Sequence, residues 1–107
     1  MYAEVLLSRT TRNTDKVFHY SIPEHLIGQL KIGHQVVVPF GPRQEVGFVV
    51  GLVETAEVKK TRDIIKLVIP EPLFSEKQLE LARWISEYYF SFLISALKLV
   101  MPPGGKL

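Results

Sequence analysis

Residues 34–52, HQVVVPFGPRQEVGFVVGL, most constrain what this chain can fold into. Two runs rich in β-branched and aromatic residues, 36–40 and 46–52, flank the polar segment 41–45. This pattern predicts a β-hairpin with a longer loop. A two-stranded hairpin is only marginally stable alone, so the rest of the chain must supply further strands or a helix.

Two residues inside the hairpin restrict what can lie beside it. Gly47 interrupts the second run, which indicates a bulge or a close approach of another backbone segment. Pro39 has no N–H group to donate, so its nitrogen must face a sheet edge or the end of a strand.

Three further short apolar runs, 2–7, 17–22 and 63–69, complete a set of five. In the second of them Phe18 and Tyr20 alternate with polar neighbours, so we expect these rings in the core and His19 at the surface. Five short strands separated by turns predict a mainly β protein with a small barrel.

The pattern changes after Pro72. Ser75 is a favourable N-cap, and Gln78 stands where a capping box requires it, which predicts a helix of about four turns lying on the barrel. Residues 92–100 suit a second short helix. The apolar side of the first helix is expected to be mostly core, although its aromatic rings could also be stacking platforms for bases. That side consists of Leu81, Ala82, Trp84, Ile85, Tyr88 and Tyr89.

These elements predict one structural domain with two parts. Residues 1–72 form the barrel, and residues 73–107 form the helical segment and the start of a linker. The segment 102–105, Pro-Pro-Gly-Gly, is typical of a helix stop followed by a linker, so we expect the natural chain to continue beyond Leu107.

Composition excludes several classes of chemistry. The 107 residues contain no cysteine, which rules out disulfides, thiol nucleophiles and cysteine-ligated zinc and fits a cytosolic protein. The formal net charge of +2, from 13 basic and 11 acidic residues, neither requires nor opposes nucleic-acid binding. We expect neither a signal peptide nor a membrane span, because the N-terminus lacks a basic region and the apolar runs are short.

Catalytic and metal-binding patterns are weak. His19, His25 and His34 lack the spacing of metal ligands, so we expect scattered surface histidines and no metal site. The segment 104–107 lacks the first glycine and the hydroxyl residue of a phosphate-binding loop. We therefore predict no catalytic residue in this chain.

Four segments in this order are familiar from one protein family: 17–24 (VFHYSIPE), 36–50 (VVVPFGPRQEVGFVV), 69–74 (IPEPLF) and 81–103 (LARWISEYYFSFLISALKLVMPP). Together they closely resemble the N-terminal domain of the PriA family of primosomal replication-restart helicases, also called primosomal protein N′. The resemblance covers nearly the whole chain.

The resemblance implies a circularly permuted OB-like barrel with one or two helices at its C-terminal side. It implies a DNA-binding module that recognises the 3′ end of the nascent leading strand at stalled or abandoned replication forks. The parent protein is then an ATP-dependent 3′→5′ DNA helicase of the bacterial cytoplasm, associated with the nucleoid and not with a membrane. Branched forks with a free 3′-hydroxyl, the downstream helicase domains and primosome proteins are its implied partners. ATP, Mg and Zn belong to the downstream domains, so this fragment needs no cofactor and is not itself an enzyme.

The resemblance also implies a pocket for the terminal nucleotide. Phe18, Gly41 and Arg62 match its aromatic, glycine and basic positions, and His19 stands where the family has Asp. A neutral His accepts a hydrogen bond from a 3′-hydroxyl as Asp does, whereas a protonated His donates. From the residues alone, the side chain of Phe18 is better explained as core, so that only its backbone would touch DNA. Gly41 is equally well explained by turn chemistry, and Arg62 and Arg43 are by default solvated charges that could also contact phosphates.

Two function classes follow from the sequence. The first is a module that captures a single-stranded DNA 3′ end. The alternative is a protein-interaction β-barrel that docks onto other helicase domains or primosome partners through an exposed edge or the apolar helix. An enzyme acting alone is a distant third.

Overall fold

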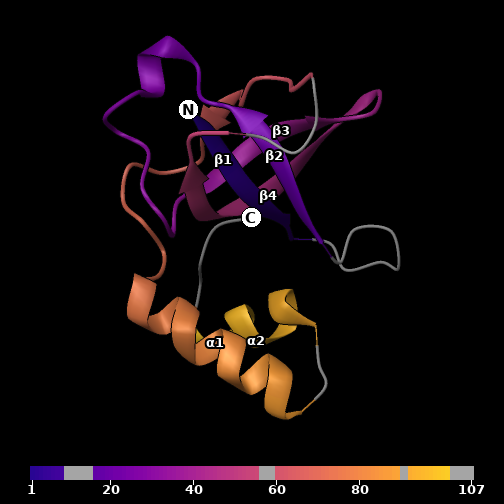
Figure 1. Cartoon of the computed structure of the whole chain (residues 1–107), viewed down its shortest axis with the longest axis vertical. Coiled ribbons are helices and arrows are strands. Elements are labelled where there is room, and N and C mark those ends of the chain that lie inside the picture. Colours follow the sequence, from indigo (N-terminus) through magenta and orange to yellow (C-terminus); the bar gives the residue numbers. More distant parts are fainter. Residues whose placement is uncertain (9–15, 56–59, 90–91, 102–107) are drawn as a thin grey trace.

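The computed structural model of this chain describes residues 1–8, 16–55, 60–89 and 92–101. The sheet has five strands in the order β2-β1-β4-β3-β5, with every neighbouring pair antiparallel (Figure 1). The strands are β1 (Tyr2–Leu7), β2 (Val17–Ser21), β3 (Gln35–Phe40), β4 (Arg43–Val53) and β5 (Lys66–Leu67). The helices are the 3-10 turn η1 (Glu24–Leu26), α1 (Glu76–Tyr88) and α2 (Leu93–Val100).

This architecture confirms a mainly β domain with C-terminal helices, consistent with a small OB-like barrel, but the sheet is not closed. Its edges meet at an isolated parallel bridge between Ser21 of β2 and Asp63, just before β5. The Ser21 N–H donates to the Arg62 carbonyl at 2.9 Å, and the Ile64 N–H donates to the Ser21 carbonyl at 3.1 Å. The segment before β5 is therefore held against the end of β2.

The hairpin forms as predicted, but its turn is shorter than expected. Phe40 pairs with Arg43, so residues 43–45 lie in β4 and only Gly41 and Pro42 form the turn. Gly41 has φ +59°, the positive value that a type II′ turn requires at its first central position. Pro42 cannot adopt a positive φ, which excludes the type I′ alternative.

Gly47 marks a close approach and not a bulge. A Cβ atom at Gly47 would lie 2.6 Å from Cγ1 of Val5 on the neighbouring strand. The irregularity instead lies further along β4, where Glu4 pairs with Gly51 but Val5 pairs with Val49.

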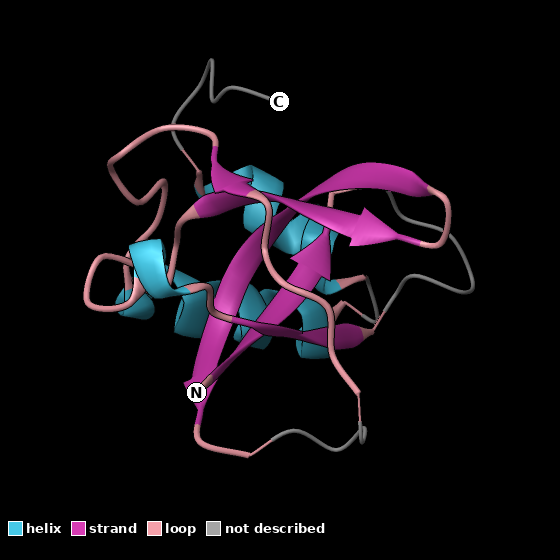
Figure 2. Ribbon diagram, turned by 90° about the horizontal axis from the view of Figure 1, so that it is seen from above, coloured by secondary structure: helices cyan, strands magenta, loops and turns pink. Residues whose placement is uncertain are grey.

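Strand alternation divides the apolar side chains between two cores. Figure 2 shows α1 and α2 behind the strands, on one side of the sheet. The barrel interior is filled by Tyr20, Leu26, Leu30 and Ile64 together with Ala3, Val5, Leu7, Val36, Val38 and Val49. The opposite face of the sheet packs against the helices through Leu6, Phe48, Val50, Phe74, Leu79, Ala82, Ile94, Ala96 and Leu97. Both helices therefore lie on the sheet face that points away from the barrel interior.

The helix start is confirmed in detail. Ser75 caps α1 by accepting a hydrogen bond from the Gln78 N–H at 3.1 Å, and the Gln78 side chain returns a bond to the Ser75 N–H at 2.8 Å. Phe74 and Leu79, on either side of the cap, are both buried. These contacts anchor α1 to the sheet at its first turn.

The expectation that the apolar side of α1 is mostly core is wrong. Leu81, Trp84, Tyr88 and Tyr89 are about half exposed or more, with Trp84 at 57%. A helix buries one stripe of its surface, and Ala82 occupies that stripe while the aromatic residues lie beside it. In addition, α2 has only eight residues and does not cover them. No helix within the described ranges is long and apolar enough to cross a membrane.

The chain between β5 and α1 is fastened to the start of β3. The Leu73 N–H donates to the Gly33 carbonyl at 2.8 Å, and Gly33 has φ +100°. His34, expected at the surface, is buried: its Nδ1 accepts from the Lys31 N–H and its Nε2 donates to the Pro70 carbonyl, both at 2.8 Å. These bonds fix the helices relative to the barrel.

Candidate nucleic-acid interface

A pocket of about 360 Å³ opens at the end of the barrel where β2 faces the β3–β4 turn. Its walls come from three segments, residues 16–20, 39–41 and 60–62. These segments are distant in the sequence, and the edge-to-edge bridge at Ser21 and Asp63 brings the third beside the first.

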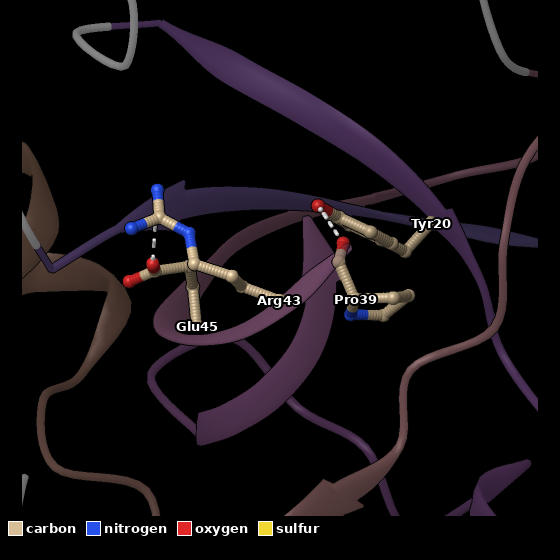
Figure 3. Close-up of polar contacts among 4 residues, drawn as sticks. All are labelled: Tyr20, Pro39, Arg43 and Glu45. Atoms are coloured by element: carbon tan, nitrogen blue, oxygen red, sulfur yellow. Dashed lines mark hydrogen bonds and ion pairs between the residues drawn. The ribbon is translucent and has the colours of Figure 1, made fainter. Parts of the chain in front are cut away.

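Four of the five residues singled out in the sequence line this pocket: Phe18, His19, Gly41 and Arg62. Arg62 and Gly41 are in direct contact, because Nη1 of Arg62 donates to the Gly41 carbonyl at 2.8 Å. Arg43 does not line the pocket. Its exposed guanidinium lies 3.8 Å from the Glu45 carboxylate on the same strand (Figure 3).

Phe18 combines a core role with a place in the pocket wall. Its ring packs edge-to-face on Phe40 with a centroid separation of 5.3 Å and borders the barrel interior. Nζ of Lys16 lies 5.2 Å from the centre of the same ring, within the range of a cation–π contact. The ring therefore forms part of the pocket wall and also holds the ammonium group of Lys16 beside the pocket.

Tyr20 ties the two strands of the pocket together. Its hydroxyl is buried and donates to the Pro39 carbonyl at 2.8 Å (Figure 3). Since β2 and β3 are not neighbours in the sheet, this bond crosses the barrel interior. Burial raises the pKa of the Tyr20 hydroxyl above its ordinary value of 10.0, and the nearby positive charge of Arg62 partly opposes that rise.

His19 points away from this tyrosine. Strand alternation places its imidazole on the opposite sheet face from Phe18 and Tyr20. There its Nε2 lies 3.4 Å from Oε2 of Glu4, the residue directly opposite on β1. The imidazole is only 11% exposed, so the expectation of a surface histidine is wrong. The imidazole thus contacts Glu4 and does not join the Arg62–Gly41 pair.

Two pocket cations were missed from the sequence. Lys16 and Lys60 line the pocket together with Arg62, and the described residues of its lining include no carboxylate side chain. Both lysines lie between the apolar runs that predict strands, and their only signal was proximity to Phe18 and Arg62 in the chain. The resulting excess of positive charge suits a phosphate-bearing ligand.

Metal chemistry finds no support in the side-chain arrangement. Among the residues that the structure describes, no three His, Asp or Glu side chains are grouped closely enough to hold an ion.

Comparison with known proteins identifies the same kind of domain. The family described as the 3′ DNA-binding domain (3′BD) of PriA matches residues 4–102. The chain is 38% identical over 107 residues to the replication restart protein PriA of Bacillus subtilis (strain 168), covering 98% of this chain and 13% of the relative. It is 44% identical over 84 residues to the PriA of Rickettsia conorii, covering 78% of this chain and 12% of that relative. A third relative, the PriA of Chlamydia pneumoniae, is 34% identical over 102 residues, or 95% of this chain and 13% of the relative.

Proposed function

The chain belongs to the family of PriA 3′ DNA-binding domains, and we propose that the pocket between β2 and the β3–β4 turn receives the 3′-terminal nucleotide of a DNA strand. The observation that carries this proposal is the hydrogen bond from Arg62 to the Gly41 carbonyl. This bond joins two residues that are far apart in the sequence and that the family resemblance assigns to the nucleotide pocket.

The charge of the pocket supports a nucleotide as ligand. Among the described residues, Lys16, Lys60 and Arg62 line it without an opposing carboxylate. The hydrogen bond from Nη1 of Arg62 to the Gly41 carbonyl holds the guanidinium at the pocket, where its other N–H groups can donate to a phosphate oxygen.

The turn supports the recognition of an end. Gly41 contributes no side chain, and nothing lies within 4 Å of the place where its Cβ would be. A nucleotide backbone can therefore approach the turn closely. In the proposed binding mode the turn lies beyond the terminal nucleotide, so that a strand continuing past the 3′-hydroxyl would collide with it.

Recognition of the 3′-hydroxyl differs from the family pattern at His19. Because the imidazole already contacts Glu4, we assign it an indirect role, supporting the backbone of residues 18–19. The hydroxyl then bonds to backbone groups or to Arg62, not to a carboxylate at this position.

The relatives and the family resemblance support a proposal for the biological setting. The chain spans 13% of the length of the Bacillus subtilis relative, which is named a replication restart protein. We propose that the chain serves a longer bacterial protein with 3′→5′ helicase activity. It would there capture the 3′ end of the nascent leading strand at branched forks and work with primosome proteins at the nucleoid.

Fluorescence anisotropy with a short oligonucleotide tests this function. Ends carrying a 3′-hydroxyl, a 3′-phosphate and a 3′ blocking group are compared at low and moderate salt. We expect the 3′-phosphate to weaken binding about tenfold, since it adds bulk and charge where the hydroxyl fits. Equal affinity for the three ends would refute end capture.

A matched pair of arginine variants locates the binding. Arg62→Ala should weaken binding about tenfold through the loss of a charge-assisted contact. Arg43→Ala removes the same side chain outside the pocket and should change affinity less than about twofold. If the two variants behave alike, the DNA lies elsewhere on the barrel.

A further inference from the structure

The exposed apolar side chains of this molecule are concentrated on one surface. Eight large hydrophobic residues are strongly exposed among the described part of the chain, and all but Met1 and Ile27 belong to α1, to α2 or to the residue that directly follows α1 or precedes α2. Five of these side chains are joined by ring contacts or by a shared groove, and we call the surface that they form the aromatic helix face. It consists of Leu81, Trp84, Tyr88, Tyr89 and Leu99.

The rings of this face are mutually ordered. Trp84 and Tyr88 stack with a centroid separation of 5.1 Å and an interplanar angle of 11°. Tyr88 and Tyr89 meet edge to face at 4.9 Å. Beside them a groove of about 520 Å³ runs between α1 and α2, with Leu81 and Leu99 in its lining. Side chains already held by one another lose less rotamer freedom when a partner covers them.

The fold itself does not require this surface. The helices are fixed to the sheet through other residues, among them Ala82 of α1 and Leu97 of α2, which are completely buried. Clustered, exposed aromatic residues are characteristic of interaction surfaces in soluble proteins. The face is therefore better explained by a partner than by packing within this chain.

Its charge favours a protein over a nucleic acid. Helices α1 and α2 together carry three glutamates, at positions 76, 80 and 87, against Lys77, Arg83 and Lys98, so their charges balance. The pocket, in contrast, is lined by Lys16, Lys60 and Arg62, with no carboxylate side chain among the described residues of its lining. A phosphate backbone would gain no net attraction at the helix face, whereas tryptophan, tyrosine and phenylalanine are enriched at the centre of protein interfaces.

The relatives indicate that the rest of a longer polypeptide is available as a protein partner. This chain corresponds to 13% of the Bacillus subtilis relative, so in such a protein most of the polypeptide is tethered to the domain. A tethered surface is present at a far higher effective concentration than a free partner. We propose that the aromatic helix face docks onto another part of the same, longer polypeptide, through an apolar patch.

This inference goes beyond the 3′-end pocket and uses none of its residues. A result that refutes DNA-end recognition by the pocket would therefore not affect the docking proposal. A result that refutes docking would not affect the proposal for the pocket.

Trp84 supplies the reporter, because it is the only tryptophan in the chain. With fluorotryptophan incorporated, the ¹⁹F solvent isotope shift between H₂O and D₂O measures how exposed the ring is. We expect a large isotope shift in this chain alone and loss of most of that shift in the longer polypeptide, where the Trp84 resonance is identified by its disappearance in Trp84→Phe. An equally large shift in both would overturn the proposal.

Two matched variants distinguish docking through the aromatic helix face from a general effect of changing any exposed aliphatic residue. Leu99 and Ile27 are exposed aliphatic residues, at 75% and 64%, but only Leu99 belongs to the face. In the longer polypeptide, Leu99→Ser should restore the isotope shift of Trp84, and Ile27→Ser should leave it suppressed. Restoration by both variants, or by neither, counts against docking at this face.

Two further titrations of the isolated chain test whether a second copy of the chain or DNA covers the aromatic helix face. The isotope shift should stay constant as the chain is concentrated and as a 3′-hydroxyl oligonucleotide is added. A loss on concentration would replace the proposed partner with a second copy of this chain. A loss on adding DNA would make the face a stacking platform instead.

Discussion

The pocket and the aromatic helix face differ in how their residues are held. In the pocket, hydrogen bonds join separate elements: Tyr20 to Pro39 across the barrel, and Arg62 to the Gly41 turn. On the helix face the rings of Trp84, Tyr88 and Tyr89 contact one another. The first arrangement fixes the shape of a cavity for a small ligand. The second gives an ordered apolar surface that suits a broad partner.

The largest expected effect comes from Gly33, where the segment that leads into α1 is hydrogen-bonded to the start of β3. In Gly33→Ala the new Cβ would lie 1.9 Å from the Phe74 carbonyl oxygen, at a backbone φ of +100°. We expect a loss of at least about 4 kcal/mol in the free energy of unfolding, combining backbone strain with displacement of the segment that carries α1. Urea unfolding measures this.

Gly28→Ala is the control for that variant. Gly28 also has a positive φ, +84°, but nothing lies within 4 Å of its Cβ position. It should lose only about 1 kcal/mol from backbone strain. Equal losses in both variants would mean that the barrel and helices are not joined through Gly33.

Two leucines on α2 test the division of the helix into a packed side and a docking side. Leu97 is completely buried and Leu99 is 75% exposed. Leu97→Ala should cost about 3 kcal/mol by leaving a cavity, whereas Leu99→Ala should change stability by less than about 0.5 kcal/mol. Thermal or urea unfolding of the isolated chain measures the change in stability of both variants. A large loss in Leu99→Ala would make the face part of the fold.

The bond across the pocket predicts an alkaline transition. The folded-state pKa of Tyr20 lies above 10.0, so its stabilising contribution is complete below that pH and is lost as pH rises through the folded-state pKa. Tyr20→Phe should cost about 1 kcal/mol at neutral pH. It should also flatten the fall in stability above pH 10.0. An unchanged alkaline profile would remove Tyr20 as its cause.

The smallest effect concerns the residue that departs from the family pattern. His19→Asp places a second carboxylate directly opposite Glu4 and should cost about 0.5 kcal/mol, less at high salt. In a Glu4→Gln background the same substitution should be nearly neutral. Double-mutant unfolding checks this. An equal cost in both backgrounds would show that the two side chains do not interact.

Local chemistry explains which features the sequence could predict. The hairpin follows from β-branched runs around Gly41 and Pro42, and the start of α1 follows from the Ser75–Gln78 capping box. Both depend on residues within a few positions of one another. The pocket residues came from the family resemblance, and the fold brings four of them to one cavity.

The features that sequence reasoning missed depend on distant segments. The contact of His19 with Glu4 requires the β1–β2 register, and the inclusion of Lys16 and Lys60 in the pocket requires the meeting of the sheet edges. The apolar width of α1 is visible in the sequence, but the short α2 decides how much of it stays exposed. Such outcomes depend on tertiary packing, which periodicity does not encode.

An NMR titration with a short oligonucleotide bearing a free 3′-hydroxyl would test the assignment of the pocket at residue level. The account predicts that the amide shifts move at Phe18, Gly41 and Arg62, move far less with a 3′-phosphate, and stay unchanged along α1. Changes centred on Trp84 and Tyr88, or identical changes with both oligonucleotides, would contradict it.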